Sequence, residues 1–379
     1  MSLTDSHQLA NENRISAGRQ LLQRLHLDLP LLIALLVLAV IGGFVLYSAS
    51  DRGTDMLIRH ALRLLIGFVI MVGIAQLQPD TIRHWSPWLY ALGLILLLAV
   101  LAFGQSGGGA QRWLDFGLFR FQPSEIMKLA VPMMLAWYLC ITAIPPSPKR
   151  LLVALLLLII PTLLIARQPD LGTALLIASA GFFVLFLAGL RWSFIVGALV
   201  ALTASTPLVW NTLLRDYQRQ RVLTFLNPEL EPLGSGYHII QSTIAIGSGG
   251  IHGKGWLNGT QAHLDFLPER STDFIFAVYS EEFGLLGVLL LLFFYAVLIA
   301  RGLMIATQAQ DTYSRLLAGS ITLTFFIYVL VNIGMVSGLM PVVGVPLPLI
   351  SYGGTSIVTL MAGFGILMSI QTHRRLIST

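Results

Sequence analysis

Long apolar runs separated by short polar connections recur along almost the whole chain. A helix needs roughly 20 mostly apolar residues to cross a bilayer, and about ten stretches satisfy this length. They are 29–47, 57–77, 88–103, 124–141, 151–166, 171–188, 192–214, 274–300, 316–336 and 347–370. Only 11% of the residues are charged, whereas a soluble globular protein carries about 25%. The pattern predicts an all-α integral membrane protein.

The polar stretches between the runs predict the layout of the chain. We expect short cytoplasmic tails at 1–28 and 372–379, and a polytopic transmembrane domain at 29–371 that carries one large extracytoplasmic loop at 215–272. Within that loop, 237–250 is predicted to form a short helix lying in the membrane interface. The apolar stretch 151–188 is interrupted by Gln168, Pro169 and Asp170. We interpret it as two spans, because about 38 residues are too many for one.

The basic residues predict the orientation in the membrane. An even number of spans places both termini on one side, and Lys and Arg favour the cytoplasmic side. A cytoplasmic N-terminus gives the cytoplasmic connections most of the basic residues of the short loops. The net charge of +5 therefore reflects topology and not nucleic-acid binding, since the basic residues form no patch. The single cysteine, Cys140, excludes an internal disulfide or a cysteine zinc site.

Polar side chains gather at five places, all predicted at the outer face. Charge inside a membrane span is costly and generally marks function. The five places are GAQRWLDFG (109–117), FQPSEIMKLA (121–130), QPDLGT (168–173), GSGGIHGKG (247–255) and LPERSTDFIFAVYSEEFG (267–284).

The first three places allow both a structural and a functional interpretation. Arg112 fits a surface ion pair beside an interfacial tryptophan. Glu125 and Lys128, three apart on one helix face, are either a neutralising salt bridge or a pocket in which Lys128 meets an anion. Asp170 fits the cap of the following helix.

The last two places differ in strength. Lys254 among glycines suggests a backbone nest for phosphate, although a glycine-rich turn explains the same residues. Asp273 is expected to open the eighth span, where it fits a helix cap. Glu281 and Glu282 follow about 12 Å further along the predicted helix and need partners or a water-filled cavity. The five places together predict a polar cavity of mixed charge that opens outward.

These motifs, with DYQRQR (216–221), GYHIIQS (236–242), EEFGLLG (281–287) and NIGMVSGLMPVVGVPLPLISYGG (332–354), resemble those of the SEDS family (shape, elongation, division and sporulation). The resemblance covers nearly all of the chain from the first span to the last. It implies a peptidoglycan glycosyltransferase in the bacterial cytoplasmic (inner) membrane, which polymerises lipid II during cell elongation and releases undecaprenyl diphosphate. The family's catalytic aspartate matches Asp273, its polar pair matches Glu125 and Lys128, and its QPDLGT acid matches Asp170.

The chemistry of glycosyl transfer fits this resemblance. The acceptor hydroxyl must lose a proton to a base, for which we assign Asp273, with its pKa expected to be raised by a carboxylate such as Glu125. Inversion at the donor carbon needs no second carboxylate as nucleophile. The leaving diphosphate needs cations, or a divalent metal such as Mg²⁺, although no ligand cluster marks a metal site. Substrate contacts are expected from Arg112, Glu125, Lys128, Asp170, Lys254, Glu281 and Ser351, the last in a proline- and glycine-rich stretch that walls the site.

Partners and rival functions complete the expectations. The resemblance implies a class B penicillin-binding protein transpeptidase as partner, together with other membrane proteins of the elongation complex, because the chain shows no crosslinking domain of its own. A lipid II flippase or transporter would use a similar cavity, but it predicts polar residues through the whole depth and internal repeats. A non-catalytic elongation scaffold would leave the buried carboxylates unexplained.

Overall fold

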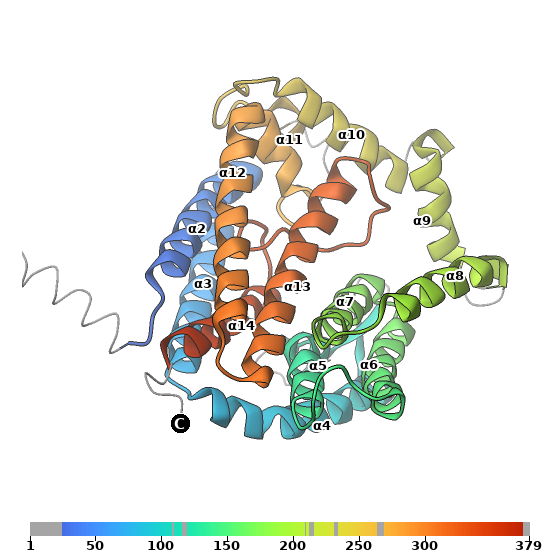
Figure 1. Ribbon diagram of the computed structural model, residues 1–379. Helices are drawn as coiled ribbons and strands as arrows, with labels where there is room; N and C mark the ends of the chain where they lie inside the picture. Colours follow the sequence, from blue (N-terminus) through green and yellow to red (C-terminus); the bar gives the residue numbers. More distant parts are fainter. Residues whose placement is uncertain are drawn as a thin grey trace, which may run out of the picture.

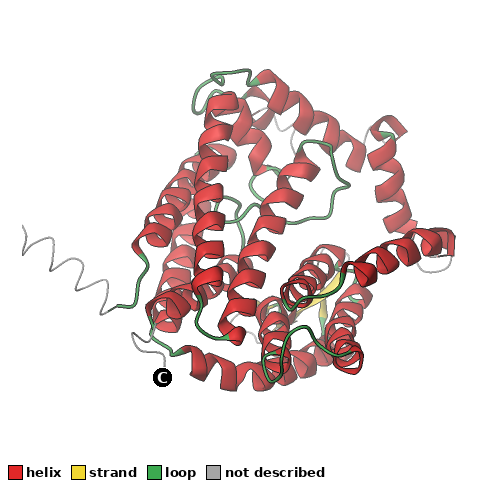
Figure 2. Ribbon diagram, viewed as in Figure 1, coloured by secondary structure: helices red, strands yellow, loops and turns green. Residues whose placement is uncertain are grey.

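The computed structural model describes residues 25–107, 110–115, 120–208, 210–211, 216–230, 234–263 and 269–373, which form a bundle of helices (Figures 1 and 2). The predicted tails at 1–28 and 372–379 lie mostly outside the described residues.

Each predicted span overlaps a helix, but the tenth was predicted to begin at 347, whereas α14 begins at Thr355, because the prolines and glycines of 346–354 do not form a helix. The helices are α2 (Leu29–Ala49), α3 (Thr54–Ala75), α4 (Pro79–Phe103), α5 (Pro123–Leu139), α6 (Pro148–Arg167), α7 (Leu171–Leu187), α8 (Trp192–Leu208), α12 (Ile275–Gln308), α13 (Thr312–Val336) and α14 (Thr355–Thr372). Among the described residues, seven helices are long and apolar enough to cross a membrane, and α7 and α8 are shorter apolar helices. The predicted break at Gln168–Asp170 separates α6 from α7, so the interpretation as two helices is confirmed.

The distribution of apolar side chains is that of a multi-pass membrane protein. Large apolar residues are exposed along the outer surfaces of the helices, as at Val40, Phe44, Leu65 and Val69, where a soluble protein would show polar ones. In α13 and α14, by contrast, 67% and 61% of the most apolar stretch is buried. These two helices therefore form the centre of the bundle, and the polar groups of α13 face protein.

The eighth predicted span is interrupted, so Glu281 and Glu282 do not lie along one continuous helix as predicted. Gly284 within α12 has φ 62° and ψ −163°, which is not helical, and the Tyr279 hydroxyl donates to the Gly287 carbonyl at 2.7 Å. Eight residues of a continuous helix would separate these two by about 12 Å. Glu281 and Glu282 therefore lie in a short first piece of α12, which folds against the long second piece (Figure 1).

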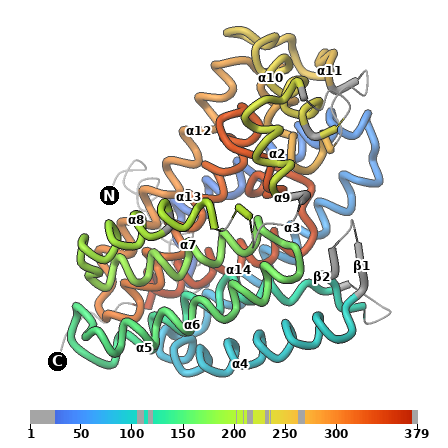
Figure 3. Tube along the Cα trace, turned by 90° about the vertical axis from the view of Figure 1, so that its right-hand side faces the viewer, coloured from blue at the N-terminus to red at the C-terminus, as the bar shows by residue number. Residues whose placement is uncertain are grey.

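The all-α fold class is confirmed, and the described residues add one small sheet that the sequence did not predict. Strands β1 (Gln105–Gly107), β2 (Ala110–Asp115) and β3 (Arg120–Phe121) pair antiparallel in the order β1-β2-β3. The sheet follows directly on α4 and precedes α5 (Figure 3). It fixes the position of the stretch that carries Arg112.

The predicted large loop is mostly helical where it is described. It contains α9 (Asp216–Leu226), a 3₁₀ turn (Pro228–Leu230), α10 (Ser235–Ser248) and α11 (Thr260–His263). The short helix expected at 237–250 is confirmed as α10, which packs on α12 and α13. We call the end of the bundle that carries α10 and α11 the loop face (Figures 1 and 3).

Candidate active site

Asp273 lies in a tight turn, Glu269–Phe274, immediately before α12. The turn is closed by bonds from the Thr272 and Phe274 amides to the Glu269 carbonyl, at 3.1 and 3.3 Å. Two outside contacts hold it in place. The Asn332 side-chain amide donates to the Asp273 carbonyl at 2.9 Å, and the Tyr352 amide donates to the Ser271 carbonyl at 2.8 Å. The turn is therefore fixed from both α13 and the 341–354 stretch.

The environment of Asp273 suits a base. Burial is the main cause that raises the pKa of the Asp273 carboxyl from 3.8 to about 6, with Glu269 adding to the rise and Arg221 opposing it. Glu125, expected from the sequence to act in this way, is not among the causes; Glu269 takes that place because it shares the turn. A carboxyl with this pKa is mostly ionised near neutral pH yet binds a proton readily.

A buried ion pair between Glu125 and Lys128 of α5 lies against α13. Lys128 Nζ donates to Glu125 Oε1 at 2.7 Å, with both side chains 7% exposed, and it lies 5.3 Å from the centre of the Tyr328 ring. Tyr328 is one helical turn from Asn332, so both side chains are on one face of α13. That face connects the Lys128 pair to the turn of Asp273. Glu125 Oε2 is buried without a hydrogen-bond partner among the described residues.

Asp170 combines the two predicted roles. It caps α7 by accepting from the Thr173 amide at 3.1 Å, and its other oxygen accepts from Gln122 Nε2 at 3.0 Å and lies 3.8 Å from Arg112 Nε. Arg112 also donates to the Pro169 carbonyl at 2.8 Å. The β2 strand and the α6–α7 break thus bring Arg112 and Asp170 together, as the cavity hypothesis requires.

The 341–354 stretch joins these groups. A side chain at Gly172, next to Asp170, would meet the Val343 carbonyl at 2.9 Å, and one at Gly344 would meet Asp273 Oδ2 at 3.4 Å. Asn332 also donates to the Val345 carbonyl at 2.7 Å. The 341–354 stretch therefore lies against the surroundings of both Asp170 and Asp273, and its role as a wall of the substrate site stays a prediction. Its predicted residue Ser351 is buried, and its hydroxyl accepts from the Leu347 amide at 2.7 Å, so it closes the wall's own turn.

A large cavity of about 1420 Å³ lies beside this wall. Its lining comes from α3, α4, β2, β3, α5 and α14, and most of it is apolar, as at Ile66, Leu89, Trp113 and Val358. Its charged lining residues are Arg63 and Glu125. The cavity therefore offers an apolar trough that ends near the polar groups.

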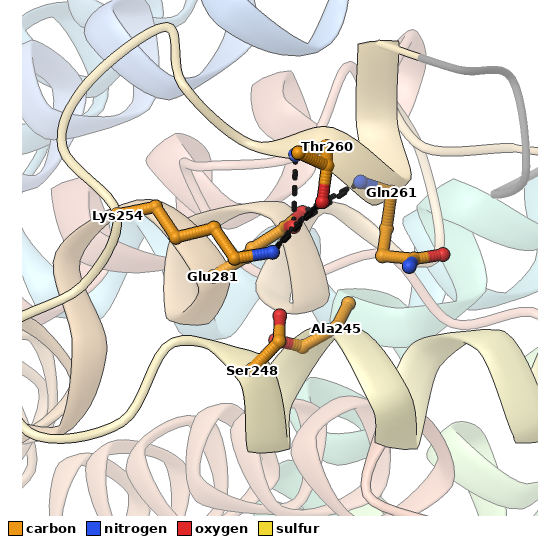
Figure 4. A network of polar contacts seen from close by, with 6 residues as sticks. All are labelled: Ala245, Ser248, Lys254, Thr260, Gln261 and Glu281. Carbon is orange, nitrogen blue, oxygen red and sulfur yellow. Dashed lines mark hydrogen bonds and ion pairs between the residues drawn. The ribbon is translucent and has the colours of Figure 1, made fainter.

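Lys254 and Glu281 form a separate cluster. Glu281 Oε1 accepts from Lys254 Nζ at 2.6 Å, from the Thr260 amide at 2.9 Å and hydroxyl at 3.0 Å, and from the Gln261 amide at 3.1 Å. Figure 4 shows these groups converging on the carboxylate above α10. The network fastens the 249–261 loop to the short piece of α12. Substrate contact by these two residues stays a prediction, and their visible role is to hold the loop.

The glycine-rich loop uses its backbone for packing. The Lys254 and Gly255 amides donate to the Glu281 and Glu282 carbonyls at 3.0 and 2.9 Å. A side chain at Gly253, whose φ is +77°, would lie 2.1 Å from the Glu282 carbonyl oxygen. These amides are therefore already bonded within the protein. This supports the interpretation of the loop as a glycine-rich turn and speaks against a backbone nest for phosphate.

Three residues at the site were not predicted. Gln122 and Asn332 are neutral amides that hold Asp170 and the Asp273 turn, and Arg63 is a charge inside α3. The cost of polar groups within spans was the signal that could have found Asn332 and Arg63; Gln122 precedes its span and offered no such signal. No group of three His, Cys, Asp or Glu residues in the described chain could hold a metal ion. Mg²⁺ commonly needs only one or two carboxylates besides substrate phosphates, and Glu269 and Asp273 are close enough to interact.

The chain is similar in sequence to known proteins over nearly its whole length. Residues 23–376 match the family model FtsW/RodA/SpoVE, described as cell cycle protein. The chain is 56% identical to peptidoglycan glycosyltransferase MrdB of Escherichia coli over 355 residues, which covers 94% of this chain and 96% of the relative. It is 32% identical to peptidoglycan glycosyltransferase RodA of Treponema pallidum, over 92% of this chain and 98% of that protein.

Solved structures show the same fold. One belongs to a study of how a peptidoglycan synthase complex coordinates polymerization and crosslinking; it aligns with a TM-score of 0.81 and 33% identity over 92% of this chain and 98% of that chain. The rod shape determining protein RodA of Thermus thermophilus aligns with a TM-score of 0.69 and 28% identity over 91% of this chain and 96% of that chain.

Proposed function

The chain belongs to the FtsW/RodA/SpoVE family and is a peptidoglycan glycosyltransferase, and we propose that it polymerises lipid II with Asp273 as the general base. The observation that carries this proposal is the setting of Asp273. A carboxyl with a pKa raised to about 6 is held by α13 and the 341–354 wall, and the same wall reaches Gly172, beside Asp170, and lines the apolar cavity at Gly354.

The transfer step follows from these residues. The acceptor 4-hydroxyl gives its proton to an oxygen of Asp273 while its own oxygen bonds to the donor's anomeric carbon from the face opposite the leaving group. The bond from that carbon to the diphosphate oxygen breaks, so the configuration inverts and undecaprenyl diphosphate leaves. Arg112 and Lys128 stabilise the charge that develops on the diphosphate. Asp170 and Glu125 keep these two cations oriented through the contacts at 3.8 and 2.7 Å.

The cavity between α3, α4, α5 and α14 suits the polyprenyl chain of such a substrate. Its apolar lining would bury hydrocarbon, and burial of apolar surface is worth about 25 cal/mol per Å². The chain would lie in the trough while the diphosphate remains at the polar end. A lipid-linked substrate thus uses both kinds of surface, whereas a soluble sugar nucleotide would use one.

Position and partners complete the proposal. We assign the loop face to the extracytoplasmic side of the bacterial inner membrane, with the tails 1–28 and 372–379 in the cytoplasm and 215–272 as the large outer loop. The relative from a synthase complex that combines polymerization and crosslinking supports a class B penicillin-binding protein as partner, alongside other elongation-complex membrane proteins.

A reconstitution assay tests the proposed function. The full chain, with a transpeptidase-inactive class B partner, is placed in proteoliposomes with lipid II on either side. We expect glycan strands on gels, made only from lipid II on the side of the loop face. Movement of lipid II across the vesicle wall without strands would favour a flippase instead, and neither activity would favour a scaffold.

A further inference from the structure

A cluster on α3 remains outside the mechanism described so far. The Arg63 guanidinium carbon lies 4.4 Å from the centre of the Tyr352 ring, a distance typical of a cation–π contact. His60, one turn earlier on α3, is 1% exposed, with its ring centre 6.4 Å from that of Tyr352. The side of α3 that faces the 341–354 wall therefore carries a charge supported on an aromatic platform.

Arg63 has an unused donor. Its Nη1 is buried and has no hydrogen-bond partner among the described residues, and the same holds for both ring nitrogens of His60. A buried polar group without a partner costs about 1–3 kcal/mol, and more when it is charged. An arginine that only extends toward water along the membrane would keep its nitrogens solvated. Nη1 instead lies enclosed beside the cavity that the Arg63 side chain lines, where the oxygen of an entering ligand would supply the missing partner.

The cavity defines the ligand that fits. Arg63 and Glu125 are its charged lining residues, and Glu125 is already paired with Lys128. The lining of the cavity is therefore mostly apolar and contains one cation, Arg63, whose Nη1 has no partner among the described residues. A molecule with a long hydrocarbon chain and an anionic head matches both features, because a guanidinium binds phosphate oxygens through charge-assisted hydrogen bonds.

We propose that Arg63, supported by the Tyr352 ring, binds a phosphate oxygen of a polyprenyl diphosphate whose chain occupies this cavity. The inference rests on the proposed function, since it concerns the lipid end of the same substrate. Arg63 is a binding residue distinct from Arg112 and Lys128, which were assigned on the side of Asp170 and α13.

The position of Tyr352 connects this residue to the reaction. The Tyr352 amide donates to the Ser271 carbonyl, two residues before Asp273. A diphosphate held above Tyr352 therefore lies against the wall that fixes the base. Arg63 would act mainly on affinity for the lipid-linked substrate and its diphosphate product, and less on the rate of the bound complex.

Direct binding tests the proposal. The full chain in detergent is titrated with undecaprenyl diphosphate, with neutral undecaprenol and with phosphatidylglycerol. The variants are Arg63→Gln, Arg63→Lys, and Arg191→Gln as a control with the same charge change at an exposed residue. We expect Arg63→Gln to weaken diphosphate binding about tenfold or more while undecaprenol binding is unchanged. Arg63→Lys should recover part of the affinity, because it keeps the charge without the fork, and the control should match the wild type.

Three outcomes would overturn it. Diphosphate binding that survives Arg63→Gln would remove the assignment, and so would equal loss of undecaprenol binding, which would indicate damage to the cavity. Phosphatidylglycerol that binds as tightly as the diphosphate, with the same dependence on Arg63, would identify an ordinary phospholipid site.

A parallel polymerisation assay separates this inference from the proposed function. If the wild type makes no strands but its diphosphate binding depends on Arg63, the inference stands and the proposed function fails. If strands form and Arg63→Gln changes neither diphosphate binding nor the lipid II concentration for half-maximal rate, the function stands and the inference fails.

Discussion

Replacing Asn332 with leucine should impair catalysis through the position of Asp273. Asn332 is fully buried and donates to the Asp273 and Val345 carbonyls at 2.9 and 2.7 Å. Leucine has a similar size but no donor. Each lost bond costs about 0.5–1.5 kcal/mol, and a buried carbonyl left without a donor costs about 1–3 kcal/mol. We therefore expect the free energy of unfolding to fall by about 2–4 kcal/mol.

The catalytic effect should be separable from this loss of stability. If half of that energy holds the base in place, kcat falls roughly tenfold, because each 1.36 kcal/mol in the barrier is a factor of ten. The KM for lipid II should change little, since Asn332 faces the turn and the wall. A looser turn also admits water to Asp273, so the pKa of its carboxyl should move from about 6 toward its ordinary value. The acid limb of the pH–rate profile should then shift to lower pH.

Polymerisation of lipid II, measured across pH with thermal unfolding of the same samples, checks this reasoning. Ser320→Ala is the matched control: its hydroxyl is buried on the same helix and donates to the Ala180 carbonyl at 2.7 Å, about 18 Å along α13 from Asn332. It should lower stability without moving the acid limb. The positioning role is refuted if Asn332→Leu and Ser320→Ala give the same kcat and the same pH profile.

Three further predictions follow from the site. The rate should fall as pH drops through about 6, because protonation removes the base at Asp273; a pH-independent rate between 5 and 7 would contradict this. Lys128→Met should lower the free energy of unfolding by about 3–5 kcal/mol, because it leaves the Glu125 carboxylate buried and unpaired. Adding Glu125→Gln should restore most of the stability but no activity, as measured by thermal unfolding and strand synthesis. A double variant no more stable than Lys128→Met alone would argue against the pair. Glu281→Gln should raise amide hydrogen exchange across 249–261, because the carboxylate anchors that loop; unchanged exchange would remove that role.

The helices were predictable because a bilayer imposes its length on the sequence. A span needs about 20 apolar residues whatever surrounds it, so the runs alone located the ten helices α2 to α8 and α12 to α14, but not α9 or α11 in the large loop. The cost of charge near a span also drew attention to Asp273, Glu125 and Lys128, whereas the proposed role of Asp273 as the base came from the family resemblance.

Features that depend on distant contacts were not predictable. The break at Gly284 requires the approach of Gly253, whose amide nitrogen would lie 2.3 Å from a side chain placed at Gly284, and a glycine in an apolar run looks like any helical residue. The strands at 105–121 form from a stretch whose pairing depends on the ends of α4 and α5. The break and the strands both depend on contacts between segments that are distant in the sequence, and the local pattern of apolar and polar residues does not predict such contacts.

Residues that act through neutral hydrogen bonds were missed for another reason. Asn332 and Gln122 carry no charge, so a search for charged residues passed over them. Arg63 lies inside the predicted span 57–77, and only its contact with Tyr352 and the adjacent cavity gives it a role.

The most direct test of the central claim is polymerisation of purified lipid II by this chain with the proposed class B partner, comparing the wild type with Asp273→Asn and Asp273→Ala. Asparagine keeps the size of the side chain, and alanine keeps the backbone contacts of the turn, but neither can accept the proton. Both variants should therefore fold, bind lipid II and make no strands. Near-normal synthesis by Asp273→Asn would contradict the account, because Asp273 would then serve the turn and not the chemistry.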